Sequence, residues 1–589
     1  MAAERLVVVL GAGINGAAIA RELVLSGVGV VVVDADDAGG GATAWSTRLV
    51  HGGLRYLEYG EIGLVRESLA ERDRLVRLAP HLVRPLPFLL PARGRTGGLL
   101  AAAARLAGLE SLARRWRGSR GRGLWAVSAG LTLYDLLATG AGWPRHRTMR
   151  TGAAPLPRVD AAAFPFAATY ADAQMLFPER FTVELLVDAR RLAAEAGTRF
   201  EVLTHHAVRP TGGGRLLAAP ADAAGGRGDA AAVELRPDAI VNATGAWVDR
   251  TLDAVLPAGD PAGRRRLIGG TKGSHLVLRT TALRAALADH GVYAEAADGR
   301  PVFVLPFGPA LVLVGTTDIP FAGDPATARA DDEEIDYLLA AVGLLFPQVA
   351  VSRGDVQQHY CGVRPLPSTA PGAGGGQPAG ITRRHLLVRQ PDAPLPCWSV
   401  VGGKLTTCRS LAEQVAAEVL PAVGLAVRGT TRDRPLPGAC AGPSRATAVA
   451  EAVAGGLRAG LSPPAAERTG ERLVAIFGAR AGAVWRHCDD PIDGTLLEGT
   501  DLPAAAVRHC VDEEWAATVD DVVCRRLMLS FDERLGRGTI RDVAAALVRA
   551  GRLRADRAAA AADACAESLG RRHGRTLQPA AAAGYHDRP

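Results

Sequence analysis

The chain has 589 residues, of which 48% are hydrophobic and 22% are charged, and this is an ordinary balance for a globular protein. The composition excludes wholesale disorder, collagen and coiled-coil rods, and eight cysteines in so long a chain exclude a disulfide scaffold. A net charge of +7 permits contact with nucleic acid or an anionic membrane but requires neither. No two cysteines have the CxxC spacing of a zinc site, and we predict no bound metal.

The first forty residues have the pattern of a strand, a helix and a second strand. Residues 6–10 are apolar, the sequence Gly-Ala-Gly-Ile-Asn-Gly follows, helical periodicity covers 17–26, and a second apolar run at 28–33 ends in an acid. The glycines allow a tight turn and the close approach of a pyrophosphate, the helix N-terminus favours its charge, and the acid accepts hydrogen bonds from a ribose. We therefore predict a dinucleotide site rather than a ligand-free turn, with contacts from Gly11, Gly13, Ile14, Asn15, Gly16 and Asp34.

A later strand favours FAD over NAD as the dinucleotide. Residues 239–242 are apolar and lead into Ala243-Thr244-Gly245, with Trp247 close behind. A late strand of this kind returns beside the first strand–helix–strand unit and closes over the cofactor, as in flavoproteins of the two-dinucleotide type. The chain is also far too long for a single Rossmann unit. An ordinary strand and turn is the alternative interpretation.

Residues 46–58 form a dense motif, Ser-Thr-Arg-Leu-Val-His-Gly-Gly-Leu-Arg-Tyr-Leu-Glu. Its histidine precedes a Gly-Gly pair that permits close backbone approach to a planar ring, and an Arg-Tyr pair follows. With this motif the chain resembles the FAD-dependent, quinone-linked glycerol-3-phosphate dehydrogenases. Further motifs keep the order of that family over roughly residues 4–550, namely Gly273-Ser274-His275, Gly315-Thr-Thr-Asp318, Gly362-Val-Arg-Pro-Leu366, Ile381-Thr-Arg383 and Gly402-Gly-Lys-Leu-Thr-Thr407.

Two positions depart from the family's pattern. The family often has lysine where this chain has Arg48, and tyrosine where it has Cys408. Arg48 keeps the positive charge, whereas Cys408 lacks a phenol hydroxyl and so casts doubt on any role for that side chain.

The resemblance implies an α/β fold with three parts: a Rossmann-like FAD-binding domain of the two-dinucleotide type, an antiparallel β substrate-binding cap and an all-α C-terminal domain. We expect the FAD domain at 1–90, 150–250 and 355–425, the cap at 250–355 and the helical domain at 430–570. Three apolar runs predict strands in the cap at 274–278, 302–305 and 311–314.

The resemblance also implies a reaction. In it, sn-glycerol 3-phosphate is oxidised at C2 to dihydroxyacetone phosphate, FAD is reduced, and the electrons pass to a quinone. Three alternatives stay open: an oxidase that uses oxygen, an amine or amino-acid oxidase of the same superfamily, and a flavin-containing nucleic-acid-binding protein. The last is disfavoured because no aromatic stacking platform accompanies the arginines. A homodimer is one option for the assembly.

The family's motifs assign roles to individual residues. The base is His51, near the flavin, or His275, near the substrate. A cationic cradle for the phosphate is expected from Arg55, Tyr56, Lys272, Arg364, Arg383 and Lys404. The remaining expected cofactor contacts are Ser46, Thr47, Arg48, His51, Gly52, Gly53, Val208, Ala243, Thr244, Gly245, Trp247, Gly402, Gly403, Lys404, Leu405 and Thr406.

Lysine is almost absent from the chain, which has Lys272 and Lys404 and no other among its 68 basic residues. Both lie beside glycines. We hypothesise that these two sites require a compact point charge, which the planar arginine fork does not supply; survival by chance is the alternative. A lysine near the flavin would also stabilise its reduced, anionic form, so both are further candidates for a role in the chemistry.

Residues 91–149 form an insertion that we expect to associate with a membrane. An apolar stretch at 99–109 precedes five arginines within 114–122, with Trp116 and Trp125 beside them, a combination typical of an interfacial anchor. No apolar run in the chain is long enough for a transmembrane helix. The prediction is a cytoplasmic protein, peripheral on the inner face of the cell membrane; an amphipathic helix with a solvated basic loop is the alternative.

Overall fold

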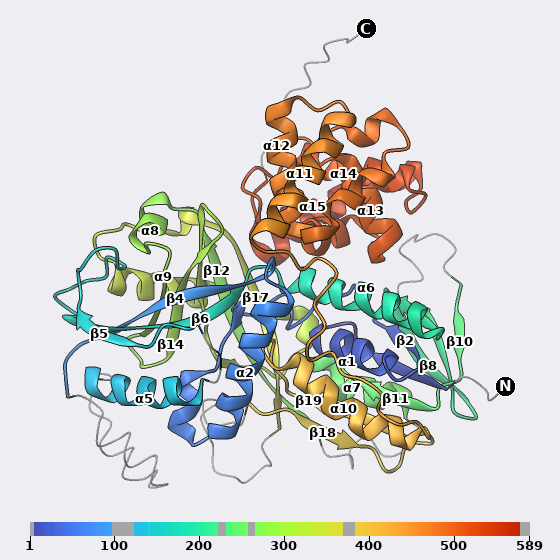
Figure 1. The fold of residues 1–589 in the computed structure, drawn as a ribbon, viewed down its shortest axis with the longest axis horizontal. Helices are drawn as coiled ribbons and strands as arrows, with labels where there is room; N and C mark the ends of the chain where they lie inside the picture. The colour runs from blue at the N-terminus through green and yellow to red at the C-terminus, as the bar shows by residue number, and fades with distance from the viewer. Residues whose placement is uncertain are drawn as a thin grey trace.

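The computed structural model describes residues 5–96, 123–138, 140, 142–221, 231–256, 266–368 and 383–577. Within these residues the chain forms two large sheets and a separate helical domain (Figure 1). The basic run at 114–122 lies outside the described residues.

The first sheet carries the predicted dinucleotide fingerprint. Its strands lie in the order β18 (Leu386–Arg389), β19 (Cys397–Val401), β11 (Ala239–Asn242), β1 (Leu6–Leu10), β2 (Gly29–Val33) and β7 (Phe200–Leu203). All neighbours are parallel except the β18–β19 pair. The late strand β11 pairs directly with β1, which confirms the predicted return of the chain.

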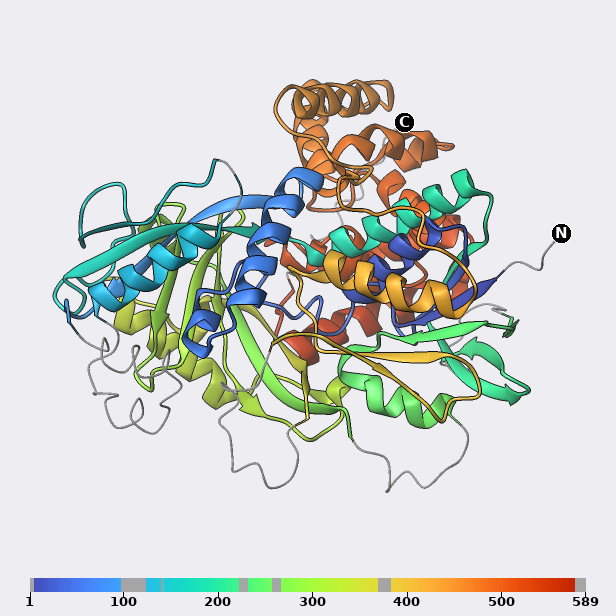
Figure 2. The ribbon, with the colours of Figure 1, turned by 60° about the horizontal axis from the view of Figure 1, so that its bottom comes forward.

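Every residue of β1 is buried, because the strand lies between two apolar cores. Val7 and Val9 face one core, which packs under α1 (Ile14–Val24), α6 (Pro178–Ala196) and α10 (Cys408–Ala422). Leu6, Val8 and Leu10 face the other, formed with α7 (Val248–Val255) and the small sheet of β8 (His206–Gly212), β9 (Arg215–Pro220) and β10 (Val233–Leu235). Figure 2 shows α6, α1 and α10, in teal, blue and gold, side by side over the first sheet.

The second sheet has ten strands and contains the expected cap. Its path is β16 (Ile319–Pro320), β12 (Ile268–Leu278), β15 (Leu311–Gly315), β14 (Pro301–Phe307), β13 (Gly291–Glu295), β4 (Val83–Ala92), β6 (Phe166–Met175) and β3 (Leu49–Val50); β17 (Val356–Pro367) pairs with β12, and β5 (Arg147–Arg150) with β6. The three cap strands predicted from apolar runs are confirmed within β12, β14 and β15. All pairs are antiparallel except β13 with β4.

The cap sheet extends beyond the expected segment 250–355. Strands β4, β6 and β17, which we had expected to lie in or beside the FAD domain, pair with the strands of the cap. Helices α8 (Thr281–Ala286) and α9 (Asp332–Leu345) cover one face of this sheet, and α2 (Ile62–Leu78) and α5 (Leu124–Leu137) cover the other. The strands of this sheet thus come from separate segments between residues 49 and 367.

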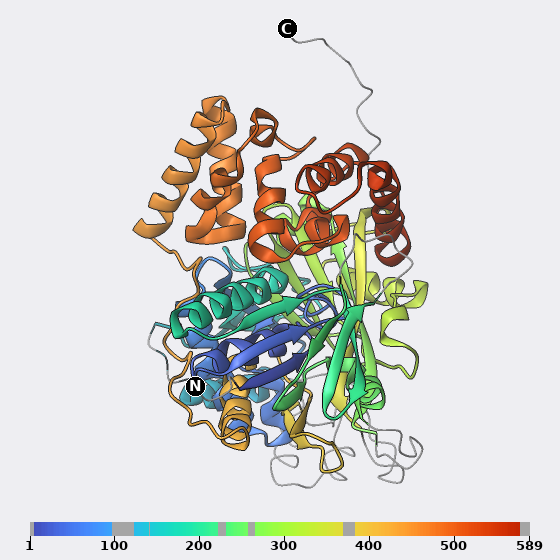
Figure 3. The ribbon, with the colours of Figure 1, turned by 90° about the vertical axis from the view of Figure 1, so that its right-hand side faces the viewer.

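The helical C-terminal domain has a core of its own. Its helices are α11 (Pro443–Arg458), α12 (Pro463–Phe477), α13 (Ala504–Glu514), α14 (Arg537–Arg549) and α15 (Ala558–His573), with a π-helical turn, η8, at Asp521–Arg526. Figure 3 shows this domain, in orange and red, above α6 and the end of β17, with which it is in contact. None of the helices in the described ranges is long and apolar enough to cross a membrane.

Candidate functional site

A cavity of about 670 Å³ lies at the carboxyl edge of the first sheet, where parallel α/β sheets bind ligands. Its walls come from the loops after β1, β2, β11 and β19, from residues 45–51, and from strands β12 and β17 of the second sheet. The cavity therefore runs from the glycine turn to the cap, and the predicted cofactor and substrate residues meet in one space.

The glycine turn fits a pyrophosphate. Helix α1 begins after Gly13, which provides no side-chain cap, and Ile14 N–H donates to Thr43 Oγ1 at 3.1 Å. The N–H groups of Asn15 and Gly16 have no acceptor within the helix and face the turn, where a ligand can bind them. A Cβ on Gly16 would lie 1.9 Å from the carbonyl oxygen of Gly11, so close helix packing explains that glycine. A Cβ on Gly13 would meet nothing nearer than the Thr43 Oγ1 at 3.4 Å and would instead point into open cavity. The space in front of Gly13 is thus kept free for a ligand.

The acid at the end of β2 is held by backbone groups. Ala12 N–H donates to Asp34 Oδ2 at 2.6 Å and Asp36 N–H donates to Oδ1 at 2.9 Å. Burial raises the pKa of Asp34 to about 6, and the nearby carboxylates of Asp36 and Asp37 add to this, against the two backbone donors. Asp34 and Val208 both line the cavity, and the fingerprint places an adenosine ribose at the acid.

Arg48 anchors the loop at the other end of the cavity. Its side chain is fully buried and forms an ion pair with Glu179 at 2.6 Å, and its Nη1 donates to the carbonyl of Leu176 at 2.7 Å. Against the effect of burial, the Glu179 carboxylate raises the pKa of Arg48. The guanidinium is therefore engaged in holding the loop rather than free to meet a substrate.

Both predicted histidines line the cavity and are neutral at neutral pH. Burial, helped by the charge of Lys404, lowers the pKa of His51 to about 3. Burial and the charges of Arg364 and Arg48 lower the pKa of His275 well below its usual value. The Nε2 of His275 lies 2.9 Å from Thr47 Oγ1, and its ring stacks on Tyr360 with 4.9 Å between centroids.

Three cations gather at the cap end of the cavity, and these are Arg364, Arg383 and Lys404. Asp318 lies between the two arginines, 3.1 Å from Arg364 Nη1 and 3.7 Å from Arg383 Nη2. The Lys404 ammonium lies 3.8 Å from the centroid of the Tyr56 ring, a cation–π distance. Burial lowers the pKa of Lys404 to about 7, and Glu61 and Glu67 only partly oppose it. Such a cluster suits a small anion.

Comparison with known proteins places this arrangement in a family. Residues 7–388 match the FAD dependent oxidoreductases, and residues 429–558 match the C-terminal domain of alpha-glycerophosphate oxidase. A glycerol-3-phosphate dehydrogenase of Synechocystis is 32% identical over 542 residues, covering 89% of this chain and 88% of that one. The chain belongs to the FAD-dependent glycerol-3-phosphate dehydrogenase family.

Two further relatives show the breadth of the family. A D-erythritol 1-phosphate dehydrogenase of Brucella abortus is 33% identical, covering 88% of this chain and 93% of that one. The solved glycerol-3-phosphate dehydrogenase of Bacillus halodurans, complexed with FAD, shares the fold with a TM-score of 0.67 at 21% identity, covering 97% of this chain and 95% of that one. FAD is accordingly the cofactor of this family member, and the glycine turn and Asp34 are shaped to hold it.

Several predicted cofactor residues of the family line the cavity. Beyond the glycine turn they include Ser46, Thr47, Ala243, Thr244, Gly245, Trp247, Gly402, Gly403, Leu405 and Thr406. Gly16, Gly52 and Gly53 are outside the lining. A Cβ on Gly52 would lie 2.5 Å from the Tyr134 hydroxyl, and Gly53 has φ +80°, so packing and a left-handed turn explain these two glycines.

Two predicted substrate cations lie away from the cavity. The Lys272 ammonium forms ion pairs with Asp331 at 2.9 Å and Glu334 at 2.7 Å, and Arg55 donates to the Tyr59 hydroxyl at 3.4 Å. On β12, Gly273 and His275 line the cavity, so the two-residue period of a strand directs Lys272 to the opposite face. Among the described residues neither one lines the cavity, so we leave both out of the proposed cradle.

The cavity also has lining residues that we did not predict. Trp45, Asp36 and Asp37 belong to its walls, and Asp318 holds two of its cations. Acids and aromatics in loops carry no periodic signal, so only the fold reveals them.

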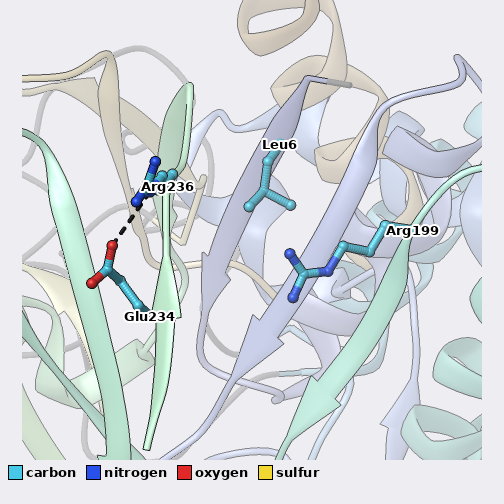
Figure 4. A pocket seen from close by; sticks show the side chains of 4 residues that line it. All are labelled: Leu6, Arg199, Glu234 and Arg236. Atoms are coloured by element: carbon cyan, nitrogen blue, oxygen red, sulfur yellow. Dashed lines mark hydrogen bonds and ion pairs between the residues drawn. The ribbon is translucent and has the colours of Figure 1, made fainter. Parts of the chain in front are cut away.

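A smaller cavity, of about 250 Å³, has no comparable chemistry. It is lined by Leu6, Arg199, Glu234 and Arg236, and Arg236 is paired with Glu234 at 3.3 Å (Figure 4). Leu6 begins β1, so this cavity lies at the amino edge of the first sheet, opposite the edge where ligands gather.

Proposed function

We propose that this enzyme oxidises sn-glycerol 3-phosphate at C2 to dihydroxyacetone phosphate and passes the electrons to a quinone. The observation that carries the proposal is the group of three cations, Arg364, Arg383 and Lys404, in the same cavity as the two neutral histidines and the FAD-binding turn. When bound, FAD accepts the hydride that leaves C2. The protein must then bind the phosphate and take the hydroxyl proton.

The cations give the phosphate a fixed place. Arginine forks bind phosphate oxygens through two parallel hydrogen bonds, and Arg364 is held by Asp318 and by Thr316 Oγ1, which accepts from Nη2 at 2.9 Å. When its phosphate is bound by the cations, the substrate can extend toward the histidines with its C2 carbinol group. Fixing the substrate in this way lowers the entropic part of the barrier.

The two histidines are suited to receive the proton because both are unprotonated at neutral pH. A phosphate dianion bound beside them opposes the effect of burial and raises their pKa toward the working range. His275 Nε2 is oriented by Thr47, and the Nδ1 of His275 is buried without a hydrogen-bond partner in the described residues. We assign His275 to the substrate and His51, whose backbone N–H is held by Thr406 at 3.1 Å, to the flavin side.

Anaerobic mixing tests the reaction directly. The yellow holoenzyme is mixed with glycerol 3-phosphate, D-erythritol 1-phosphate, glycerol or glycine, and the visible flavin absorbance is followed. We expect rapid bleaching by glycerol 3-phosphate and none by glycerol or glycine, because only the phosphorylated polyols carry the anion that the cradle binds. Bleaching by glycine alone would indicate an amino-acid oxidase, and faster bleaching by D-erythritol 1-phosphate would reassign the substrate within the phosphopolyols.

For the acceptor, we propose a quinone met at a membrane surface. Helix α5 exposes a stripe of Trp125, Ala129, Thr132 and Leu136, at i, i+4, i+7 and i+11, and Trp125 and Leu136 are 53% and 76% exposed. A tryptophan and a leucine on one open helix face suit contact with lipid headgroups and acyl chains. Oxygen is the alternative acceptor.

Two measurements test this second proposal. Oxygen uptake should be slow and should give way to quinone reduction when a soluble quinone analogue is added. Flotation with anionic liposomes should weaken in the double variant Trp125→Ala/Leu136→Ala, while dye reduction in solution is unchanged. The matched control is Leu457→Ala/Ile492→Ala, which removes two other exposed apolar side chains. Equal flotation of both variants would contradict the assignment of α5.

A further inference from the structure

The C-terminal domain holds a carboxylate of the FAD-binding loop. Arg526 donates to both oxygens of Asp37, with Nη1–Oδ2 at 2.6 Å and Nη2–Oδ1 at 2.7 Å, and Arg525 Nε donates to Oδ2 at 2.6 Å. Asp37 and Arg526 are almost entirely shielded from solvent. Buried, bidentate pairs of this kind are geometrically specific, so Asp37 is held in one place by the helical domain.

Asp37 belongs to the loop that follows β2 and lines the cavity next to Asp34. Within the described residues, the cavity lining ends at Thr406, so no C-terminal domain residue touches it. Any effect of the domain on FAD must therefore act through the loop.

The same segment meets the C-terminal domain at two more positions. The Phe531 ring lies under the Arg48 guanidinium, 4.7 Å away, and the His573 ring is 4.9 Å from the ring of Trp45. Trp45 and Arg48 both line the cavity. Residues 37, 45 and 48 thus have the cofactor space on one side and the helical domain on the other.

The π-helical turn that carries the two arginines is tied to the FAD domain at its first residue. Asp521 Oδ2 accepts from Ala517 N–H at 2.9 Å and lies 2.9 Å from His205 Nε2. His205 N–H in turn donates to the carbonyl of Asp36 at 2.8 Å. Asp37, His205 and Asp521 bring metal-binding atoms within 4.8 Å of one another, but two arginines already supply the positive charge there, which disfavours a cation.

We infer that the C-terminal domain positions the FAD-binding segment 34–48 through Arg526, so that cofactor binding and docking of the domain stabilise each other. Coupling of two equilibria is reciprocal. Bound FAD therefore strengthens the contact of the helical domain, and loss of the contact weakens FAD. Arg526 acts as a positioning residue and does not touch the cofactor.

Variants of the full chain test one direction of the coupling. Arg526→Gln should raise the dissociation constant of FAD by about tenfold or more, the effect of one lost charge-assisted interaction. Arg526→Lys should restore part of the affinity, since it keeps the charge but not the fork. The matched control is Glu514→Gln, which breaks an equally buried pair with Arg180 across the same interface. The Glu514 carboxylate bonds Arg180 and Arg480, and the variant keeps the backbone carbonyl that accepts from Arg526 Nε. FAD affinity in this control should stay within about twofold of wild type.

Hydrogen exchange of the unmodified chain tests the other direction and needs no variant to fold. Adding FAD to the apoprotein should slow amide exchange in residues 517–531, although these residues lie outside the cavity. The inference is overturned if exchange there is the same with and without FAD. It is equally overturned if folded Arg526→Gln binds FAD as tightly as wild type, or if Glu514→Gln weakens FAD as much as Arg526→Gln does.

Discussion

The two ends of the cavity are built in different ways. Most of the cofactor end is made of backbone groups, glycines and acids from one stretch of chain, residues 10–48, and the loop after β11 completes it. The substrate end is made of charged side chains that arrive singly from distant segments, such as Arg364 and Lys404. Changes at the first end should therefore remove the cofactor, and changes at the second should weaken the substrate while the cofactor stays bound.

The largest effect is expected at Gly13. Gly13→Val should abolish FAD retention while the fold survives, because the side chain would enter the cavity and the nearest protein atom to its Cβ is 3.4 Å away. The flavin-to-protein ratio and the thermal unfolding midpoint measure these two effects. By contrast, Gly16→Ala should lower both the flavin content and the unfolding midpoint, because its Cβ would clash with the Gly11 carbonyl. A fully flavinated Gly13→Val protein would show that the cavity in front of the turn is not the pyrophosphate site.

Arg364→Ala should have the next largest effect, confined to the substrate. Loss of one charge-assisted phosphate contact costs about 1.5–3 kcal/mol, which lowers kcat/KM by about 10- to 150-fold. Most of the change should appear in KM for glycerol 3-phosphate, with FAD content unchanged. Arg55→Ala is the control, since Arg55 is outside the lining. An equal loss in both variants would remove the distinction between cradle and surface arginines.

Lys404 should impose a pH dependence on substrate capture. Its pKa of about 7 means that it is charged below pH 7 and neutral above, so kcat/KM should fall as the pH rises through about 7. Lys404→Met should lower kcat/KM at pH 6 by about tenfold or more and abolish this falling limb. Ionisation of the substrate phosphate affects the pH profiles of wild type and variant alike, so the difference between the two profiles gives the contribution of Lys404. A limb that rises through pH 7 in wild type and is absent from Lys404→Met would assign Lys404 to the base instead.

The smallest kinetic effect is expected at the other lysine. Lys272→Met should leave KM and FAD content unchanged, because its ammonium faces Asp331 and Glu334 rather than the cavity. It should lower the free energy of unfolding by about 1–3 kcal/mol, since Glu334 is buried and loses a charged partner. Denaturant unfolding and steady-state kinetics check this together, and a raised KM with normal stability would return Lys272 to the cradle.

The different construction of the two cavity ends also explains why the sequence predicts the cofactor end better than the substrate end. The first strand, the glycine turn, the helix and Asp34 are contiguous, and each has a local physical signal, so the cofactor end is predictable in detail. The three cap strands are likewise visible as apolar runs. The family motifs identify Arg364 and Lys404, which line the cavity. The side of β12 on which the Lys272 side chain lies depends on the register of this strand with its neighbours, which the sequence alone does not show.

Strand β4 shows why much of the second sheet escaped prediction. It contains Pro85, Pro87 and Pro91, and proline ordinarily argues against an interior strand. The three prolines are an even number of residues apart, and successive residues of a strand direct their N–H groups to alternate edges. The missing N–H groups therefore lie along one edge. One edge of β4 is paired with β13 only at Phe88 and Leu89, whereas the other pairs with β6 along the whole strand. The prolines are thus tolerated where no partner needs a donor, which only the assembled sheet reveals.

The order of strands in the first sheet has a consequence for synthesis of the chain. Strand β1 pairs with β11, and the sheet is completed by β19, almost four hundred residues after β1. At 5–20 residues per second, β1 leaves the ribosome about 20–80 s before β19. During that interval β11 lacks its partner strand β19, and α1 lacks α10, which packs beside it. We therefore expect nascent chains shorter than about 400 residues to depend on chaperones that shield apolar segments.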